Sequence, residues 1–286
     1  MSWDGKTRGN LFGHQIFVFA LNSLGLWFAY FILLFVALYF FLFVRRSRKS
    51  VFYFFHSRLG YSVLSAYWAT YINFFKFGQN LIDKFAIMSG GKSKYSTTHK
   101  GGEYLDEMTK NGTGGVLMSG HVGNFEVGGQ LLERLGGKIN VIMQDEDHEK
   151  IKKYVESKSK KKSFNIIAIK EDLSHVINIK NALTNNEFIC VHGDRFIEGA
   201  ETIEIDFLGK KAKFPKGPFV IATRFGAPVT FNFVIKTGMR SYQFSATEPK
   251  LYRHKLDECM KDYVSKLEEV VRSNPHQWFN HYDFWA

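Results

Sequence analysis

An uncharged apolar stretch near the N-terminus limits most strongly how this chain can fold. Residues 16–44 contain no acidic, basic or histidine side chain and are rich in Phe and Leu. Because a helix needs about 20 apolar residues to cross a bilayer, we predict that this stretch is a membrane anchor. Asn22, Ser23 and Gly25 interrupt it, so two arrangements stay open. One is a single long, tilted helix; the other is a short interfacial helix followed by an embedded helix over residues 26–44.

Basic residues follow the stretch at once, in the segment Arg45-Arg46-Ser47-Arg48-Lys49. Such residues flank membrane segments on the cytoplasmic side, which predicts an inner-membrane protein whose remaining chain faces the cytoplasm. Lys6 and Arg8 favour the same side, and a re-entrant anchor would satisfy both ends. A cleaved signal peptide is not expected, because the stretch is too long and no small-residue cleavage site follows it.

Composition narrows the partners that the chain can have. The formal net charge is +11, and residues 150–162 are rich in Lys. This balance suits an anionic membrane surface or a nucleic acid. We expect no nucleic-acid partner, because aromatic residues are scarce in the Lys-rich segment and no nucleic-acid motif is present. The two cysteines, Cys190 and Cys259, suggest neither a disulfide framework nor a cysteine metal site, as in a reducing compartment.

After the anchor, assigned to residues 1–49, residues 50–286 form one predicted domain. Residues 50–87 read as two helices broken near Gly60 and Gly78. Helical and strand patterns then alternate, which predicts an α/β fold with a mostly parallel central sheet flanked by helices. The predicted helices are residues 103–110, 124–135, 148–158, 173–183 and 254–272, and the predicted strands are residues 115–118, 139–143, 165–169, 187–191, 211–214, 229–236 and 242–247.

A histidine follows the strand over residues 115–118, in the segment Ser119-Gly120-His121-Val122-Gly123-Asn124-Phe125-Glu126. The glycines allow a tight turn before the next helix. Residues five apart do not share a helix face, so His121 and Glu126 can meet only if His121 precedes that helix. A carboxylate beside an imidazole fixes its tautomer and raises its basicity. The pair therefore predicts a general base that deprotonates a hydroxyl or an amine.

The turn offers two further candidates. The N–H groups of Gly123 and Asn124 are expected at a helix N-terminus, where they would favour developing negative charge. Asn124 could equally serve only as the helix N-cap.

Asp194 and Arg195 follow the strand over residues 187–191. Because ligands bind beyond the carboxyl ends of strands in open α/β sheets, they would share a crevice with His121 if the two strands are neighbours. The Arg195 fork could hold a phosphate or the negative charge of a tetrahedral intermediate, with Asp194 orienting it. The alternative is a surface ion pair with Asp194 or Glu198.

The segment His-x-Gly-Asn-Phe-Glu resembles the signature of the lysophospholipid acyltransferase superfamily. It looks most like the branch that holds the late acyltransferases of lipid A biosynthesis and the mycobacterial phosphatidylinositol mannoside acyltransferases. Other segments resemble motifs of the same branch. They are Gly193-Asp194-Arg195, residues 207–209 and 214–218, and Pro275-His276-Gln277-Trp278. Residues 280–283 depart from the Trp-Phe-His and basic residues that lipid A enzymes tend to carry, so the acceptor lipid stays open.

The resemblance implies a membrane-bound acyltransferase. It would move a fatty acyl group from an acyl carrier protein or coenzyme A thioester to a hydroxyl of a membrane glycolipid, such as a lipid A precursor. His121 and Glu126 would be catalytic, and Gly123, Asn124, Asp194 and Arg195 would bind substrate, with no metal or other cofactor. Two alternatives are the same fold acylating an aminolipid or a polyene or pigment lipid, and a non-catalytic lipid-binding membrane protein. The presence of both His121 and Glu126 disfavours the latter.

Overall fold

Parallel strands form the centre of the sheet in the computed structural model, which describes residues 24–88, 95–124, 127–128, 137–144, 164–169, 172, 174–196 and 199–285. From one edge inward, the parallel neighbours are β4 (Asn165–Ile169), β3 (Ile139–Gln144), β5 (Phe188–His192), β2 (Gly115–Ser119) and β8 (Pro228–Lys236). Beyond them, β9 (Ser241–Ala246) is antiparallel to β8, and β1 (Ser96–Lys100) is parallel to β9. The short β10 (Lys250–Leu251) pairs with the start of β8. The predicted α/β class is confirmed.

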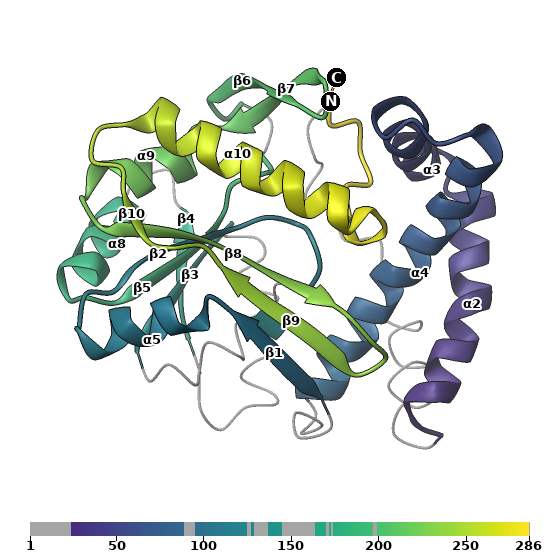
Figure 1. Cartoon of the computed structure of the whole chain (residues 1–286), viewed down its shortest axis with the longest axis horizontal. Helices are drawn as coiled ribbons and strands as arrows, with labels where there is room; N and C mark the ends of the chain where they lie inside the picture. The colour runs from purple at the N-terminus through teal and green to yellow at the C-terminus, as the bar shows by residue number, and fades with distance from the viewer. Residues whose placement is uncertain are drawn as a thin grey trace.

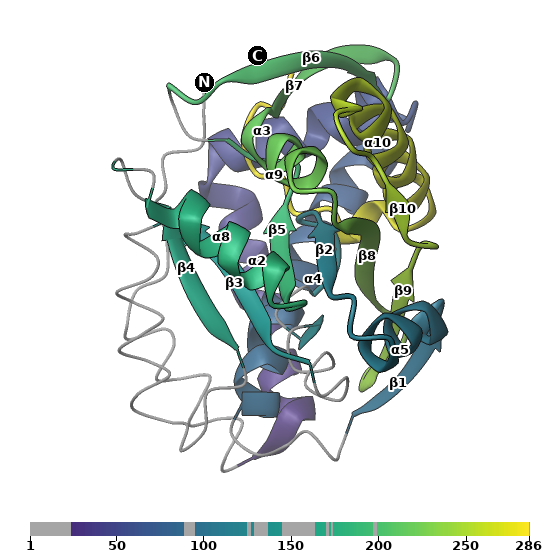
Figure 2. The same ribbon diagram turned by 90° about the vertical axis from the view of Figure 1, so that its left-hand side faces the viewer.

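Helices cover both faces of this sheet (Figures 1 and 2). On one face lies α5 (Gly102–Lys110), and on the other lie α8 (Ser174–Thr184), α9 (Gly217–Arg224) and α10 (Leu256–Ser273). Side chains alternate along β2, as they must on a pleated strand. Val116 and Met118 join the core beneath α10, whereas Leu117 joins the core beneath α5. Both faces of β2 are therefore buried, and its chemistry can appear only at its ends.

A hairpin of β6 (Thr202–Phe207) and β7 (Lys210–Pro215) lies beside the C-terminus (Figure 1). The predicted strand over residues 211–214 is confirmed, whereas β6 was not predicted. Phe207 of β6 packs on Trp278 and Trp285, which follow the short 3₁₀ helix η4 (Pro275–Gln277). The C-terminal aromatic residues are thus core packing, and they fix the end of the chain against the hairpin.

The N-terminal helices stand beside the sheet. They are α2 (Gly25–Phe43), α3 (Arg45–Tyr53), the π-helical turn η1 (Phe54–Arg58) and α4 (Val63–Met88). Within the described part of the chain, α2 is the one helix long and apolar enough to cross a membrane. It begins at the interruption seen in the sequence, and the earlier part of the uncharged stretch lies outside the described residues. Exposed aromatic residues such as Trp27, Phe31 and Phe35 cover its outer face.

The predicted break near Gly60 is confirmed, because Gly60 has a positive φ of 74° between η1 and α4. The predicted break near Gly78 is wrong, since α4 continues through that residue. The reason is packing: α2 and α4 lie side by side (Figure 1), and a Cβ on Gly78 would overlap the side chain of Leu33 in α2. Gly78 is therefore a close-approach residue and not a helix breaker.

Two predicted helices cannot be compared with the structure. Residues 148–158 lie outside the described residues, together with the Lys-rich segment over residues 150–162. Of the helix predicted over residues 124–135, only Val127 and Gly128 are described as helical.

We expect Gly78→Leu to destabilise the protein, because overpacking at a close contact costs about 1–3 kcal/mol. Helix propensity alone predicts the opposite sign, since Leu stabilises a helix by about 1 kcal/mol relative to Gly. Thermal unfolding in detergent measures the difference. Leu33→Ala should restore part of the lost stability in the double variant. A Gly78→Leu protein as stable as the wild type would contradict the close packing of α2 on α4.

Candidate active site

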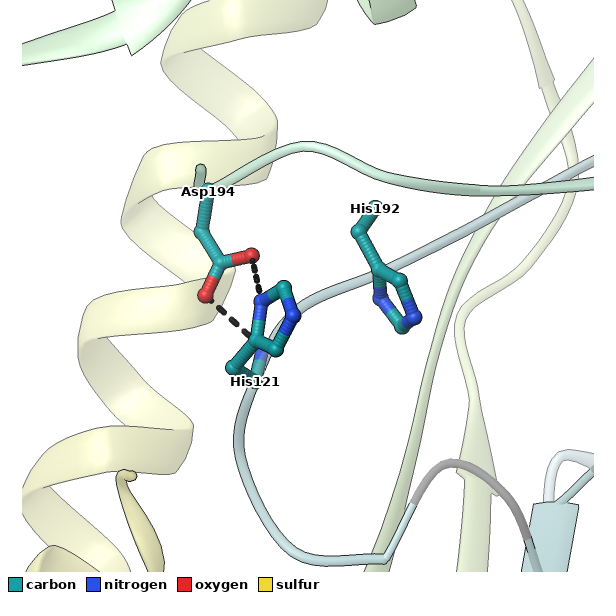
Figure 3. A group of neighbouring side chains, drawn as sticks. All are labelled: His121, His192 and Asp194. Atoms are coloured by element: carbon teal, nitrogen blue, oxygen red, sulfur yellow. Dashed lines mark hydrogen bonds and ion pairs between the residues drawn. The ribbon is translucent and has the colours of Figure 1, made fainter. Parts of the chain in front are cut away.

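His121 and Asp194 meet at the carboxyl ends of two adjacent strands. His121 follows β2 and Asp194 follows β5, and these strands pair in parallel with Ser119 opposite His192. The Asp194 carboxylate accepts two hydrogen bonds from His121 (Figure 3). The backbone N–H lies 2.7 Å from Oδ2, and ring Nδ1 lies 2.7 Å from Oδ1. The two strands are therefore neighbours, as the prediction required, and Asp194 lies beside His121 at their carboxyl ends.

Two glycines permit this approach. A Cβ on Gly193 would lie 2.8 Å from the ring of Tyr263, and a Cβ on Gly120 would lie 3.0 Å from the hydroxyl of the same tyrosine. Tyr263 projects from α10 and donates its hydroxyl to the carbonyl oxygen of Ser119 at 2.9 Å. The helix α10 therefore presses directly on both strand ends, and only glycine leaves room for it.

Asp194 is ionised in this setting. Burial alone would raise the pKa of Asp194, but the His121 ring, its hydrogen bond and the positive charge of Arg195 hold that pKa below its ordinary value. A carboxylate that accepts from Nδ1–H fixes the imidazole tautomer and leaves the Nε2 lone pair as the basic site. The arrangement can thus remove a proton from a substrate at Nε2.

A second imidazole, His192, lies on the side of His121 opposite Asp194 (Figure 3), with 4.7 Å between the two ring centroids. Burial, followed by the neighbouring His121, lowers the pKa of His192 to about 3. His192 therefore stays neutral at physiological pH.

In the described part of the chain, His121, His192 and Asp194 also offer ligand atoms that lie within 4.8 Å of one another. A group of this kind could hold a metal ion. Nδ1 of His121 and the Asp194 carboxylate already satisfy each other. The group therefore has the geometry of a hydrogen-bonded dyad beside a second imidazole.

Glu126, the predicted partner of His121, lies outside the described residues, so that contact stays a prediction. The structure gives Asp194 a role different from the expected one of orienting Arg195, because both of its oxygens face His121. The contact between Asp194 and His121 was not predicted. The signal available was the equal position of the two residues, each two residues beyond the end of its strand.

The turn after His121 is built as a cap. Oδ1 of Asn124 accepts from the N–H of Val127 at 3.3 Å, as an N-cap residue does. The expectation that the Gly123 and Asn124 N–H groups stabilise an oxyanion needs correction. The first donates to the carbonyl oxygen of Gln277 at 2.8 Å and the second to that of Val234 at 2.7 Å. Both therefore hold the turn in place, and they are already used by protein acceptors.

Arg195 is half-buried and turned toward the C-terminal segment. Its guanidinium donates to the carbonyl oxygen of Phe279 and lies 5.8 Å from the centroid of the Tyr282 ring. This placement differs from a surface ion pair with Asp194, and Glu198 lies outside the described residues. Contact of Arg195 with substrate stays a prediction.

A sequence profile of the bacterial lipid A biosynthesis acyltransferases matches residues 69–283. The chain belongs to this family. No curated protein gives a significant match to the sequence. The protein is therefore an acyltransferase that acts in lipid A biosynthesis. The matched range includes His121, Asp194 and Arg195, and it begins within α4, so that α2 lies before it.

In this acyltransferase the C-terminal segment closes against the site. The N–H of Phe279 donates to the carbonyl oxygen of His121 at 3.0 Å, and Val122 forms an isolated bridge with Trp278. The Gln277 side chain makes two 2.9 Å hydrogen bonds with the backbone N–H and carbonyl of Lys236. A segment more than 150 positions later in the sequence thus holds the histidine turn in place.

Gly123→Ala should unfold at a clearly lower temperature than the wild type and lose activity. Gly123 has a φ of +69°, and an added Cβ would overlap the carbonyl group of Val234. Gly209→Ala is the matched control, because its φ is +75° with nothing within 4 Å of the added Cβ. Both carry the cost of about 1–2 kcal/mol for a left-handed residue with a side chain, so differential scanning calorimetry isolates the overlap. Equal losses in the two variants would contradict the close approach of this turn to β8.

Proposed function

We propose that the protein transfers a fatty acyl group from an acyl thioester to a hydroxyl of a lipid A precursor, with His121 as general base. One observation carries the proposal: a buried, ionised Asp194 holds both the backbone and the ring of His121 at the carboxyl ends of β2 and β5. In a chain of the lipid A acyltransferase family, this dyad has the parts that activation of a hydroxyl requires.

The reaction needs one proton to move from the acceptor hydroxyl to His121 and then from His121 to the leaving thiolate. Nε2 of His121 takes the proton of the acceptor hydroxyl as the oxygen attacks the thioester carbonyl carbon. The resulting imidazolium donates its Nδ1–H to Asp194, whose negative charge stabilises it. When the tetrahedral intermediate collapses, the carbon–sulfur bond breaks and the thiolate receives the proton from His121. Attack is direct, so no acyl-enzyme forms.

The neighbouring His192 supports this cycle by remaining neutral. A second positive charge within 5 Å would oppose formation of the imidazolium, and the low pKa of His192, about 3, removes that opposition at physiological pH. Glu126 is proposed to act with Asp194 on His121, as the sequence predicts.

Arg195 is proposed to meet negative charge on the donor, the acceptor or the intermediate. Its guanidinium, held by Phe279 and Tyr282, puts a cation next to the His121–Asp194 dyad. The donor is proposed to be an acyl carrier protein or coenzyme A thioester. Both are anionic, and the net charge of +11 favours their approach.

We further propose that residues 1–49 anchor the protein in the inner membrane, with residues 50–286 on the cytoplasmic side as the acyltransferase domain. The apolar α2 and its exposed aromatic side chains support an embedded helix. The basic residues that open α3 follow α2 directly and suit an anionic lipid surface.

We expect His121→Ala to lower the turnover number by ~10²–10⁴-fold, the usual loss on removal of a general base. The measurement is mass spectrometry of lipid A precursors after incubation with purified enzyme and an acyl thioester. His99→Ala, at an exposed histidine of the edge strand β1, is the control and should keep wild-type turnover. A turnover number of His121→Ala within a few-fold of the wild-type value would contradict the role of His121 as general base.

A further inference from the structure

A buried carboxylate, Asp83 of α4, ties several elements together. Its Oδ1 accepts from the hydroxyls of Tyr30 and Tyr95, the latter at 2.9 Å. Its Oδ2 accepts from the ammonium of Lys236 and the hydroxyl of Tyr242. These residues, which we call the Asp83 cluster, come from α2, α4, β8, β9 and the residue before β1. Asp83 is 0% exposed and Lys236 5%, so water takes almost no part.

Stability alone does not account for such a cluster. A buried ion pair is seldom worth more than apolar residues of the same volume, because both charges must leave water. Lys236 also donates to the carbonyl oxygen of Met239 at 2.6 Å and lies 4.9 Å from the centroid of the Tyr242 ring. Both oxygens of Asp83 and two of the three Lys236 donors therefore have defined partners, which fixes the relative positions of these side chains.

One arm of the Asp83 cluster reaches the turn that carries His121. The Tyr242 hydroxyl accepts from Nδ2 of Asn124 at 3.3 Å, and the same amide donates to the carbonyl oxygen of Asn80 at 3.2 Å. Nδ2 of Asn80, one helical turn before Asp83, donates to the carbonyl oxygen of Gly123 at 2.9 Å. Asp83 thus connects to both residues that close the turn.

A second arm runs through the backbone of Lys236. The Gln277 side chain bonds this backbone on both sides, and the Gln277 carbonyl oxygen accepts from the N–H of Gly123. The two arms reach Gly123 through different residues, Asn80 and Gln277. A shift of Asp83 can therefore reach the turn through these hydrogen bonds, the backbone of α4 and the side chain of Lys236.

The other end of the cluster is the apolar helix α2. Tyr30 is 6% exposed and belongs to the face of α2 that packs on α4. No other polar side chain of α2 has a carboxylate partner among the described residues.

We propose that Asp83 and Tyr242 are positioning residues for acyl transfer, and that the Tyr30–Asp83 contact couples the seating of α2 to the geometry of the His121 turn. The proposal rests on the proposed role of His121. It makes the membrane helix a working part of the enzyme, so that acyl transfer depends on how α2 lies against α4 and not only on attachment to the membrane.

Single hydroxyl deletions test this. Tyr242→Phe and Tyr30→Phe keep the rings and remove one hydrogen bond to a carboxylate. We expect each to lower the turnover number about ten-fold, the size of one such bond, with KM for both substrates within about two-fold of wild type. Tyr252→Phe is the control, because it deletes a similar hydroxyl bond, to Asp262 at 2.8 Å, in another part of the molecule. Its turnover should match the wild type.

Asp83→Asn would strand the Lys236 charge and can fail to fold, so a second readout uses the tyrosine variants only. Hydrogen exchange followed by mass spectrometry should show the peptide over residues 119–124 exchanging about ten-fold faster in Tyr30→Phe and Tyr242→Phe than in Tyr252→Phe. Unchanged exchange or unchanged turnover in both variants would overturn the proposal. Exchange is measured without substrate, so its failure is distinguishable from failure of the proposed reaction.

Discussion

The contact between Asp194 and His121 is the interaction on which the rest of the site depends. A carboxylate with almost no access to water is costly unless its oxygens are paired, and here one residue supplies both donors. To bring these groups together, the ends of β2 and β5 must lie side by side, and Tyr263 of α10 must pack against both. Gly120 and Gly193 leave the room that this packing needs. The C-terminal segment then closes the turn through Phe279. Packing of distant segments, more than local sequence, creates the basic nitrogen.

The apolar helix α2 is joined to this site by polar contacts as well as apolar ones. The family match begins within α4, yet α2 lies along that helix and supplies Tyr30 to the Asp83 cluster. A helix whose only task is attachment needs no buried hydroxyl directed at a carboxylate. With α2 as the proposed anchor, the helix in the bilayer would also be connected, through Asp83, to the turn that carries His121.

Much of the fold and part of the site follow from sequence. Alternation of apolar runs and amphipathic segments gives β2, β3, β4, β5 and the helices α5, α8 and α10 to within a few residues, because both signals are local. Strand β6 alternates polar and apolar residues as well, so its signal was present and overlooked. The contact of Asp194 with His121 could be expected from sequence only on the condition that β2 and β5 are neighbours, because long-range pairing sets that adjacency. Gly78 was misread for a related reason: helix propensity treats glycine as a breaker, whereas contact with Leu33 makes it a requirement.

A double-variant cycle on His121 and Asp194 tests whether the two residues act as one unit. If Asp194 acts only by holding His121, the residues work as one unit and their losses do not multiply. Turnover of purified Asp194→Asn, His121→Ala and the double variant is measured with one acyl thioester and one lipid A precursor. We expect the double variant to be no slower than His121→Ala alone. A double variant slower by the product of the two single losses would show that Asp194 serves some other step, and would contradict the dyad.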